Sequence, residues 1–260
     1  MLYRLVDVHA HLEEIKDLEA ALERARKVGV CAVVTAGSGY SSSRQALQLS
    51  ERHSNADPRV YAVIGVHPWN LRAMESSKIN STLEFVRANV DKAVGVGEIG
   101  LDYWLKEVRK DQSKRELQKK VFKSLLEIAK DCEKPVVVHS RGAWKDCFDL
   151  VKEAGVRKAV FHWFTGPPDV LEDLLKGGYM VSATPAAAYS KELRRTMQST
   201  PIEKILLETD SPVNYRGKTA EPADVVTTLN EVAALKGMEK EDVVDKTTRN
   251  AVNLFSIPEI

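Results

Sequence analysis

The chain has 260 residues, a length typical of one large domain, and we expect residues 1–260 to form a single domain. The chain has 38 lysine and arginine residues and 37 aspartate and glutamate residues. The formal net charge of +1 excludes a strong overall electrostatic attraction to nucleic acid or to membrane surfaces. Three dispersed cysteines, no basic leader and no apolar stretch of about 20 residues predict a cytoplasmic protein without a membrane segment.

Apolar, β-branched runs recur along the chain at fairly even intervals and predict strands that are buried on both faces, as in a parallel sheet. The predicted strands are residues 4–8, 31–35, 60–66, 93–99, 135–138, 158–161, 179–182 and 205–207. The segments between them have the apolar spacing of amphipathic helices. The predicted helices are residues 17–25, 43–53, 81–89, 115–132, 143–154, 169–176 and 190–198, with extra C-terminal helices over 223–235 and 240–255.

Eight such strand–helix units predict an α/β fold of the TIM (β/α)8 barrel type, because right-handed crossovers between eight parallel strands close naturally. A doubly wound open sheet is the alternative, but no glycine-rich phosphate fingerprint follows the first strand. The longest irregular stretch, residues 101–113, follows the fourth strand. A loop at that end of a barrel strand is a natural cover for an active site.

Two histidines, His9 and His11, come directly after the first predicted strand. Residues two apart in an extended segment face the same side, so both imidazoles are expected to point in one direction. Two imidazoles in this arrangement can bind one metal ion.

Later strands are also followed directly by residues that can bind a metal. These residues are Glu98, His139, His162 and Asp210. The carboxyl ends of all strands in a parallel barrel meet on one rim, so we expect the six side chains to converge there. A fifth histidine, His67, follows the third strand on the same rim, and only His53 of the six histidines lies on a predicted helix. Structural roles do not explain this concentration of histidines at strand ends.

Six candidate ligands exceed the three protein ligands that are typical of one catalytic zinc ion, and two divalent ions about 3.5–4 Å apart use them better. A carboxylate can bridge two cations, and Glu98 lies midway round the predicted barrel. One ion would take His9, His11, Glu98 and Asp210, and the other would take Glu98, His139 and His162. Nitrogen and oxygen ligands without a thiolate suit Zn, Mn, Co or Mg.

Five motifs in this order closely resemble those of the TatD family of metal-dependent deoxyribonucleases, within the amidohydrolase superfamily, over residues 6–255. They are Asp7-Val8-His9-Ala10-His11, Gly65-Val66-His67-Pro68, Gly97-Glu98-Ile99-Gly100-Leu101-Asp102-Tyr103, Pro135-Val136-Val137-Val138-His139-Ser140-Arg141 and Glu208-Thr209-Asp210-Ser211-Pro212. The resemblance implies a TIM barrel, the metal sites above and exonuclease activity on DNA, with single-stranded or 3′ ends as substrate. It implies no obligate protein partner. Two segments depart from the family pattern: the residues around His162, and the run 217–222, which keeps only Glu221-Pro222.

From this resemblance we expect a hydroxide, activated by two ions, to attack the phosphorus, with Asp210 binding one ion and accepting a proton. His67 and Arg141 are expected to hold a phosphate, although Arg141 in a salt bridge between loops is an equal alternative. Asp102 is expected to orient a ligand or the long loop. Aromatic side chains on predicted rim loops either stack bases or pack the loops against the barrel. They are Trp69, Tyr103, Trp104, Trp163 and Phe164.

Other functions also fit the residues. A hydrolase of the same superfamily could act on an amide, a lactone, a small phosphoester or the ester of an aminoacyl-tRNA. Binuclear enzymes of that kind usually bridge their ions with a carboxylated lysine, and no lysine stands in the place of Glu98. A binding protein on an inherited barrel is the non-enzymatic alternative, and the presence of all six candidate ligands argues against it.

Overall fold

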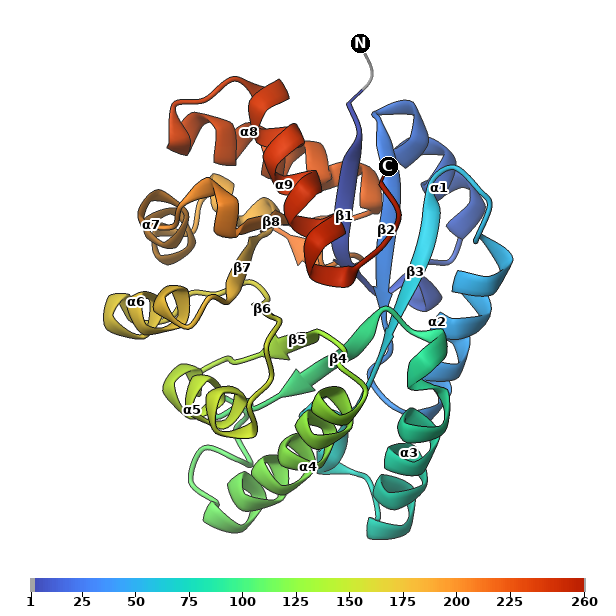
Figure 1. Ribbon diagram of the computed structural model, residues 1–260, viewed down its shortest axis with the longest axis vertical. Helices are drawn as coiled ribbons and strands as arrows, with labels where there is room; N and C mark the ends of the chain where they lie inside the picture. The colour runs from blue at the N-terminus through green and yellow to red at the C-terminus, as the bar shows by residue number, and fades with distance from the viewer. Residues whose placement is uncertain (1–2, 260) are drawn as a thin grey trace.

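The computed structural model describes residues 3–259 and confirms the predicted TIM barrel (Figure 1). Eight parallel strands lie in sequence order, and each pairs with the next. The strands are β1 (Leu5–Ala10), β2 (Val30–Ala36), β3 (Arg59–Ile64), β4 (Gly95–Gly100), β5 (Val136–His139), β6 (Ala159–Phe161), β7 (Met180–Ala183) and β8 (Ile205–Leu207). Helices alternate with them: α1 (Leu18–Lys27), α2 (Tyr40–Arg52), α3 (Ser76–Asn89), α4 (Gln112–Asp131), α5 (Trp144–Ala154), α6 (Pro168–Lys176), α7 (Lys191–Ser199) and α8 (Val225–Lys236).

The barrel closes between β1 and the residues that follow β8. The backbone N–H of Asp210 donates to the carbonyl oxygen of His9 at 2.9 Å, and that of His11 donates to Ser211 at 2.7 Å. The buried carboxylate of Asp7 accepts hydrogen bonds from the backbone N–H and the hydroxyl of Thr209, at 2.9 and 2.6 Å. These bonds join the two ends of the sheet directly beside His9, His11 and Asp210.

The last helix, α9 (Lys240–Phe255), is additional to the eight helices of the barrel and lies next to β1 and β8 (Figure 1). Its buried Leu254 and Phe255 belong to the apolar cluster that contains Val6 of β1 and Leu206 of β8. The side chain of Asn250 donates to the carbonyl oxygens of Ile202 and Ile205, both at 2.8 Å. The helix thus seals the barrel at the end opposite the rim that carries the histidines.

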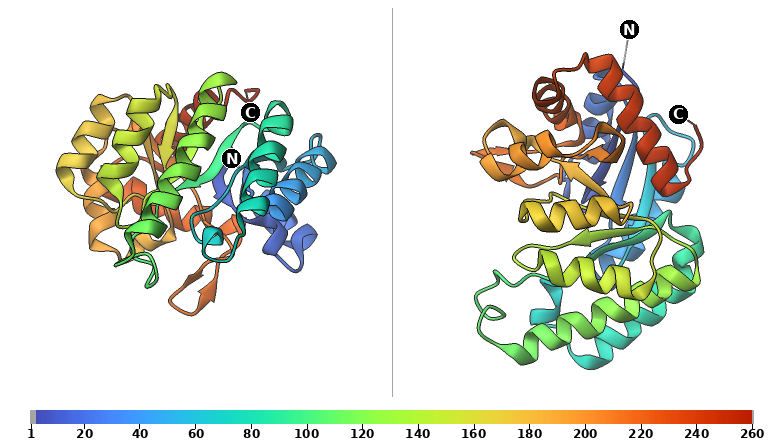
Figure 2. Two further views of the ribbon diagram at one scale, coloured as in Figure 1. Left: turned by 90° about the horizontal axis from the view of Figure 1, so that it is seen from below. Right: turned by 60° about the vertical axis from the view of Figure 1, so that its left-hand side comes forward.

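A short hairpin, β9 (Asn214–Tyr215) and β10 (Lys218–Thr219), was not expected from the sequence. It is the orange segment that projects from the molecule in the left view of Figure 2. Two-residue strands carry too little periodicity to be recognised from sequence. Within residues 3–259, no helix is both long enough and apolar enough to cross a membrane.

Candidate metal centre

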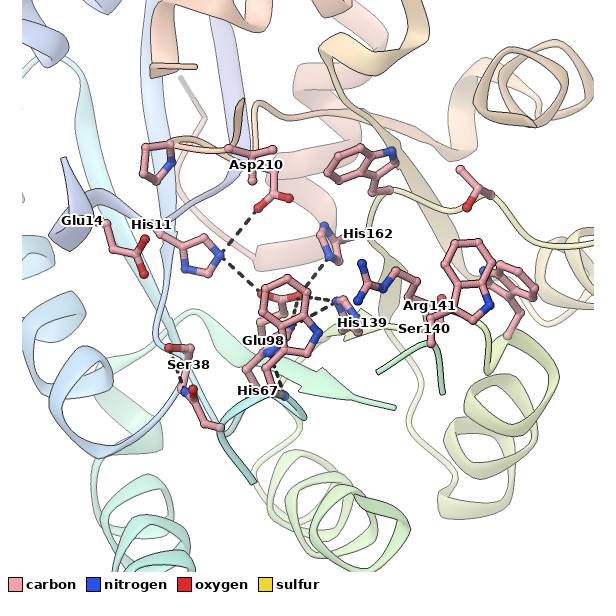
Figure 3. Close-up of a pocket in the computed structure, with 18 residues that line it drawn as sticks. His11, Glu14, Ser38, His67, Glu98, His139, Ser140, Arg141, His162 and Asp210 are labelled. Atoms are coloured by element: carbon pink, nitrogen blue, oxygen red, sulfur yellow. Dashed lines mark hydrogen bonds and ion pairs between the residues drawn. The ribbon is translucent and has the colours of Figure 1, made fainter. Parts of the chain in front are cut away.

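The six predicted ligands meet at the carboxyl ends of the barrel strands. His9 and Glu98 lie within β1 and β4, and His139 is the last residue of β5. His11, His162 and Asp210 lie in the loops that follow β1, β6 and β8. Figure 3 shows the carboxylate of Glu98 in the middle, with His11 and Asp210 on one side and His139 and His162 on the other. All of them except His11 are buried.

Two strands carry an extra residue beside a candidate ligand. Between Asp7 and Ala10, β1 has one residue more than the matching segment of β2. In the same way, β4 has one residue more than β5 between Val96 and Ile99, which brackets Glu98. A bulge of this kind redirects a side chain and is frequent next to active sites. The extra residue in β1 lies in the segment that contains His9, whose Nε2 is 3.4 Å from Glu98.

The two oxygens of Glu98 face different groups of histidines. Oε2 lies 3.4 Å from Nε2 of both His9 and His11. Oδ1 of Asp210 lies 3.5 and 3.6 Å from the same two nitrogens. Oε1 of Glu98 lies instead 2.9 Å from Nδ1 of His139 and 3.0 Å from Nε2 of His162. A single carboxylate therefore separates two clusters of donor atoms.

The spacing in the first cluster fits a metal ion better than hydrogen bonds. Neither ring nitrogen of the buried His9 makes a hydrogen bond within residues 3–259. Ligand atoms about 2.0–2.1 Å from a tetrahedral ion lie about 3.4 Å from one another. The distances of 3.4 to 3.6 Å among His9, His11, Glu98 and Asp210 match that geometry.

Hydrogen bonds at the opposite ring nitrogen leave three histidines with a lone pair on the nitrogen that faces Glu98. His11 places Nδ1 3.1 Å from the carbonyl oxygen of Ala36, which can only accept. His162 places Nδ1 3.3 Å from Glu208, and His139 places Nε2 3.0 Å from Asp102. Each outer nitrogen must therefore carry the proton, and the inner nitrogen is available as a metal ligand.

His67 has the opposite arrangement. Its Nδ1 accepts a hydrogen bond from the backbone N–H of Trp69 at 3.1 Å, so a neutral ring carries its proton on Nε2. That Nε2 lies 3.1 Å from Oε1 of Glu98. Burial lowers the pKa of His67 from its ordinary 6.5 to about 4 and keeps the ring neutral. The hydrogen-bonded tautomer is a donor toward the cavity and cannot bind a metal through Nε2.

The low pKa of His67 predicts a pH dependence of stability. The unfolded chain binds a proton at His67 near pH 6.5, whereas the folded chain binds it only near pH 4. The contribution of His67 to the free energy of unfolding is therefore fully present above pH 6.5 and is lost as the pH falls toward 4. Melting curves of the metal-free protein should show a steeper loss between these pH values than those of the His67→Gln variant. Parallel losses in the two proteins would contradict the assignment.

The two carboxylates that face the histidines are anionic. Burial acts to raise the pKa of Glu98, but the imidazoles that surround its carboxylate outweigh burial and lower the pKa well below its usual range. Burial also opposes ionisation of Asp210, and contacts with His11, His162 and His9 lower its pKa in net. A pair of buried anions among neutral or protonated imidazoles provides the charge that divalent cations require.

Asp102 connects one candidate ligand to the walls of the cavity. Its Oδ2 accepts from Nε2 of His139 at 3.0 Å, from the indole N–H of Trp69 at 2.6 Å and from Nε of Arg141 at 2.8 Å. Its Oδ1 accepts from the backbone N–H of Trp104 at 2.9 Å. Burial acts to raise the pKa of Asp102, but these donors lower it in net. Arg141 thus forms the salt bridge between loops that was one alternative, while its Nη atoms make no hydrogen bond within residues 3–259.

A cavity of about 610 Å³ opens over the cluster. All four tryptophans of the chain line it: Trp69, Trp104, Trp144 and Trp163. Trp144 was not predicted, because it lies one turn beyond the Arg141 motif on a segment that reads as a helix. Phe164 takes the second of the two roles expected for it and packs the loop after β6 against the barrel, since its side chain is fully buried beside Phe161. Tyr103 also does not line the cavity, and its hydroxyl donates to Asp146 at 2.8 Å.

Sequence reasoning gave no role to two further residues at the site. Glu208 is fully buried, and its Oε1 accepts from the backbone N–H of Trp163 at 3.0 Å as well as facing His162. Asp7 holds Thr209, as described above. Both belong to motifs that contain a candidate ligand two residues away, and that alternation was the available signal.

Comparisons with known proteins agree with this geometry. Residues 6–256 match the model of the family described as TatD related DNase. The human protein named deoxyribonuclease TATDN3 is 31% identical and aligns with 96% of this chain and 94% of its own length. A Bacillus subtilis protein named uncharacterized metal-dependent hydrolase YabD is also 31% identical, over 97% of this chain and 99% of its own. The crystal structure of the TatD homolog YJJV from Escherichia coli superposes with a TM-score of 0.89 at 25% identity, covering 99% of this chain and 100% of that one.

Proposed function

The chain belongs to the family of TatD-related DNases, and we propose that it hydrolyses phosphodiester bonds of DNA. Relatives of the chain are named as metal-dependent hydrolases. In this proposal the enzyme uses two divalent ions and acts as an exonuclease on single-stranded or 3′ ends. The observation that carries the proposal is the position of Glu98, with one oxygen toward each of two clusters of histidine nitrogens. Zinc, magnesium and manganese all suit such mixed nitrogen and oxygen ligands.

We assign His9, His11 and Asp210 to one ion, His139 and His162 to the other, and Glu98 to both, according to the carboxylate oxygen that each histidine nitrogen faces. When bound, the ions would supply Lewis acidity at the phosphate and lower the pKa of a water molecule. Asp210 is also the proton acceptor in this proposal, because its carboxylate is ionised and lines the cavity. Asp102 orients His139 by accepting a hydrogen bond from its Nε2–H.

Two donors hold the substrate phosphate in this proposal. Arg141 is fixed through Nε by Asp102, which leaves its two Nη groups for a phosphate oxygen. His67 offers Nε2–H from beside Glu98. Both residues line the same cavity as Asp210.

Replacing His67 with glutamine should separate phosphate binding from metal binding. Loss of one preorganised donor at the reacting phosphate should lower kcat by about 100-fold. Metal content should stay at the wild-type value, because His67 in its hydrogen-bonded tautomer is no ligand. Elemental analysis beside a nuclease assay checks both parts. A variant that loses one ion per chain would place His67 among the ligands.

The proposed function is tested by metal analysis together with digestion of single-stranded DNA labelled at either end. We expect two divalent ions per chain and stepwise release of the 3′ label first. Inactivity on DNA beside activity on a lactone, amide or aminoacyl ester would assign the site to another reaction of the superfamily. A fully active enzyme with one ion per chain would contradict the assignment of Glu98 as a bridge between two ions.

A further inference from the structure

We propose that Trp104 and Trp144 form a binding site for one nucleobase of the substrate, beside the phosphate held by Arg141. The inference rests on the proposed function for its substrate and adds the residues that recognise the base. Both indoles line the cavity above the candidate metal centre. They lie edge to face, with ring centroids 5.8 Å apart and planes at 86°.

The other two tryptophans of the cavity are already engaged. The indole N–H of Trp69 donates to Asp102, and the guanidinium carbon of Arg141 lies 5.1 Å from the centre of its ring. Trp163 lies against Tyr215, with ring centroids 5.5 Å apart. The indole nitrogens of Trp104 and Trp144, by contrast, make no hydrogen bond within residues 3–259, and Trp104 is 59% exposed. A large exposed aromatic surface in a cavity marks a place where a ligand binds.

The two indole rings pack closely against two glycines. A Cβ atom at Gly142 would lie 2.3 Å from Cδ1 of Trp104, and one at Gly166 would lie 2.7 Å from Cγ of Trp144. Gly142 also has a φ of +70°, which disfavours any other residue. The backbone N–H of Trp104 is bonded to Asp102 as well. These contacts restrict the positions of the rings before a ligand arrives, which reduces the entropy lost on binding.

The charge next to the pair indicates which kind of aromatic ligand fits. Gly142 follows Arg141 in the sequence, so the Trp104 ring lies beside the residue whose Nη groups are free for a phosphate. Figure 3 shows Arg141 and Ser140 on one side of Glu98, and Glu14 and Ser38 on the other. An aromatic platform beside a guanidinium suits a base joined to a phosphate, as in a nucleotide of a single strand.

The test compares two ligands by calorimetry on the manganese-loaded protein: dAMP, and 2-deoxyribose 5-phosphate, which lacks the base. Wild type should bind dAMP roughly 10-fold more tightly, the effect of one base stacked on an aromatic side chain. Trp104→Ala should bind the two ligands within about twofold of each other, with affinity for the sugar phosphate unchanged. Trp104→Phe should keep most of the preference. Tyr40→Ala, which removes an exposed aromatic residue outside the cavity, should behave as wild type.

Equal binding of the two ligands by wild type, or an undiminished preference in Trp104→Ala, would overturn the proposal. Hydrolysis provides a second readout: Trp104→Ala should raise KM for a single-stranded oligonucleotide by roughly 10-fold and leave kcat within about twofold. A fall in kcat with KM unchanged would also count against a base site. If wild type prefers dAMP but cleaves no oligonucleotide, the base site stands and the proposed DNA hydrolysis fails. If it cleaves DNA without any preference for dAMP, the reverse holds.

Discussion

Substituting alanine for Glu98 should reduce kcat/KM on single-stranded DNA by at least about a thousandfold, because the Lewis-acid effect of metal ions is worth several kcal/mol. The same change should remove most of the bound metal. Each oxygen of Glu98 faces one cluster of histidine nitrogens, so its loss takes a ligand from both proposed ions at once. Elemental analysis and kinetics on the same preparation measure the two effects.

The barrel should remain folded in Glu98→Ala, since no backbone group depends on this carboxylate for a hydrogen bond within residues 3–259. Circular dichroism checks this point. Glu107→Ala is a matched control: its carboxylate lies on the loop after β4 but pairs with Arg72 at 3.2 Å and does not line the cavity. Full metal content and wild-type activity in Glu98→Ala would remove Glu98 from the centre.

Asparagine at position 102 is expected to weaken metal binding by about 10- to 100-fold, the usual cost of losing a hydrogen-bond partner behind a ligand histidine. Asp102 accepts a hydrogen bond from Nε2–H of His139, whereas the amide of asparagine can turn its NH₂ toward that nitrogen instead. The same oxygen also accepts from Trp69 and Arg141. The single neutral oxygen of asparagine cannot accept hydrogen bonds from all three donors, so Arg141 should lose its position. KM for DNA should therefore rise together with the loss of metal affinity.

Metal titrations followed by kinetics at saturating metal separate the two consequences of Asp102→Asn. A KM that stays high when metal is restored indicates the displaced Arg141, because metal occupancy no longer differs. Asp146→Asn is the matched control, since Asp146 accepts from Tyr103 and pairs with Lys119 outside the cavity. Unchanged metal affinity in Asp102→Asn would show that His139 does not need this partner.

Much of the site follows from the order of residues along the chain. Each candidate ligand lies at or just beyond the end of an apolar run, and parallel strands in a barrel bring those ends to one rim. The positions of His9, Glu98 and Asp210 were therefore predictable without knowledge of any contact between them. The aromatic lining was less predictable. Trp144 lines the cavity and Phe164 is buried in the core, although each follows a strand that ends in a candidate histidine ligand.

The sequence alone determined the eight strands, the helices between them and the rim on which the histidines gather, because burial on both faces leaves continuous apolar runs in the chain. Only the tertiary structure decided which nitrogen of each histidine faces Glu98. That choice depends on Ala36, Asp102 and Glu208, which come from other strands or their loops. The tertiary structure also decided the bulges at His9 and Glu98 and the packing of Trp104 against Gly142. Local periodicity records how deeply a residue is buried, whereas contacts between distant segments exist only after the barrel has closed.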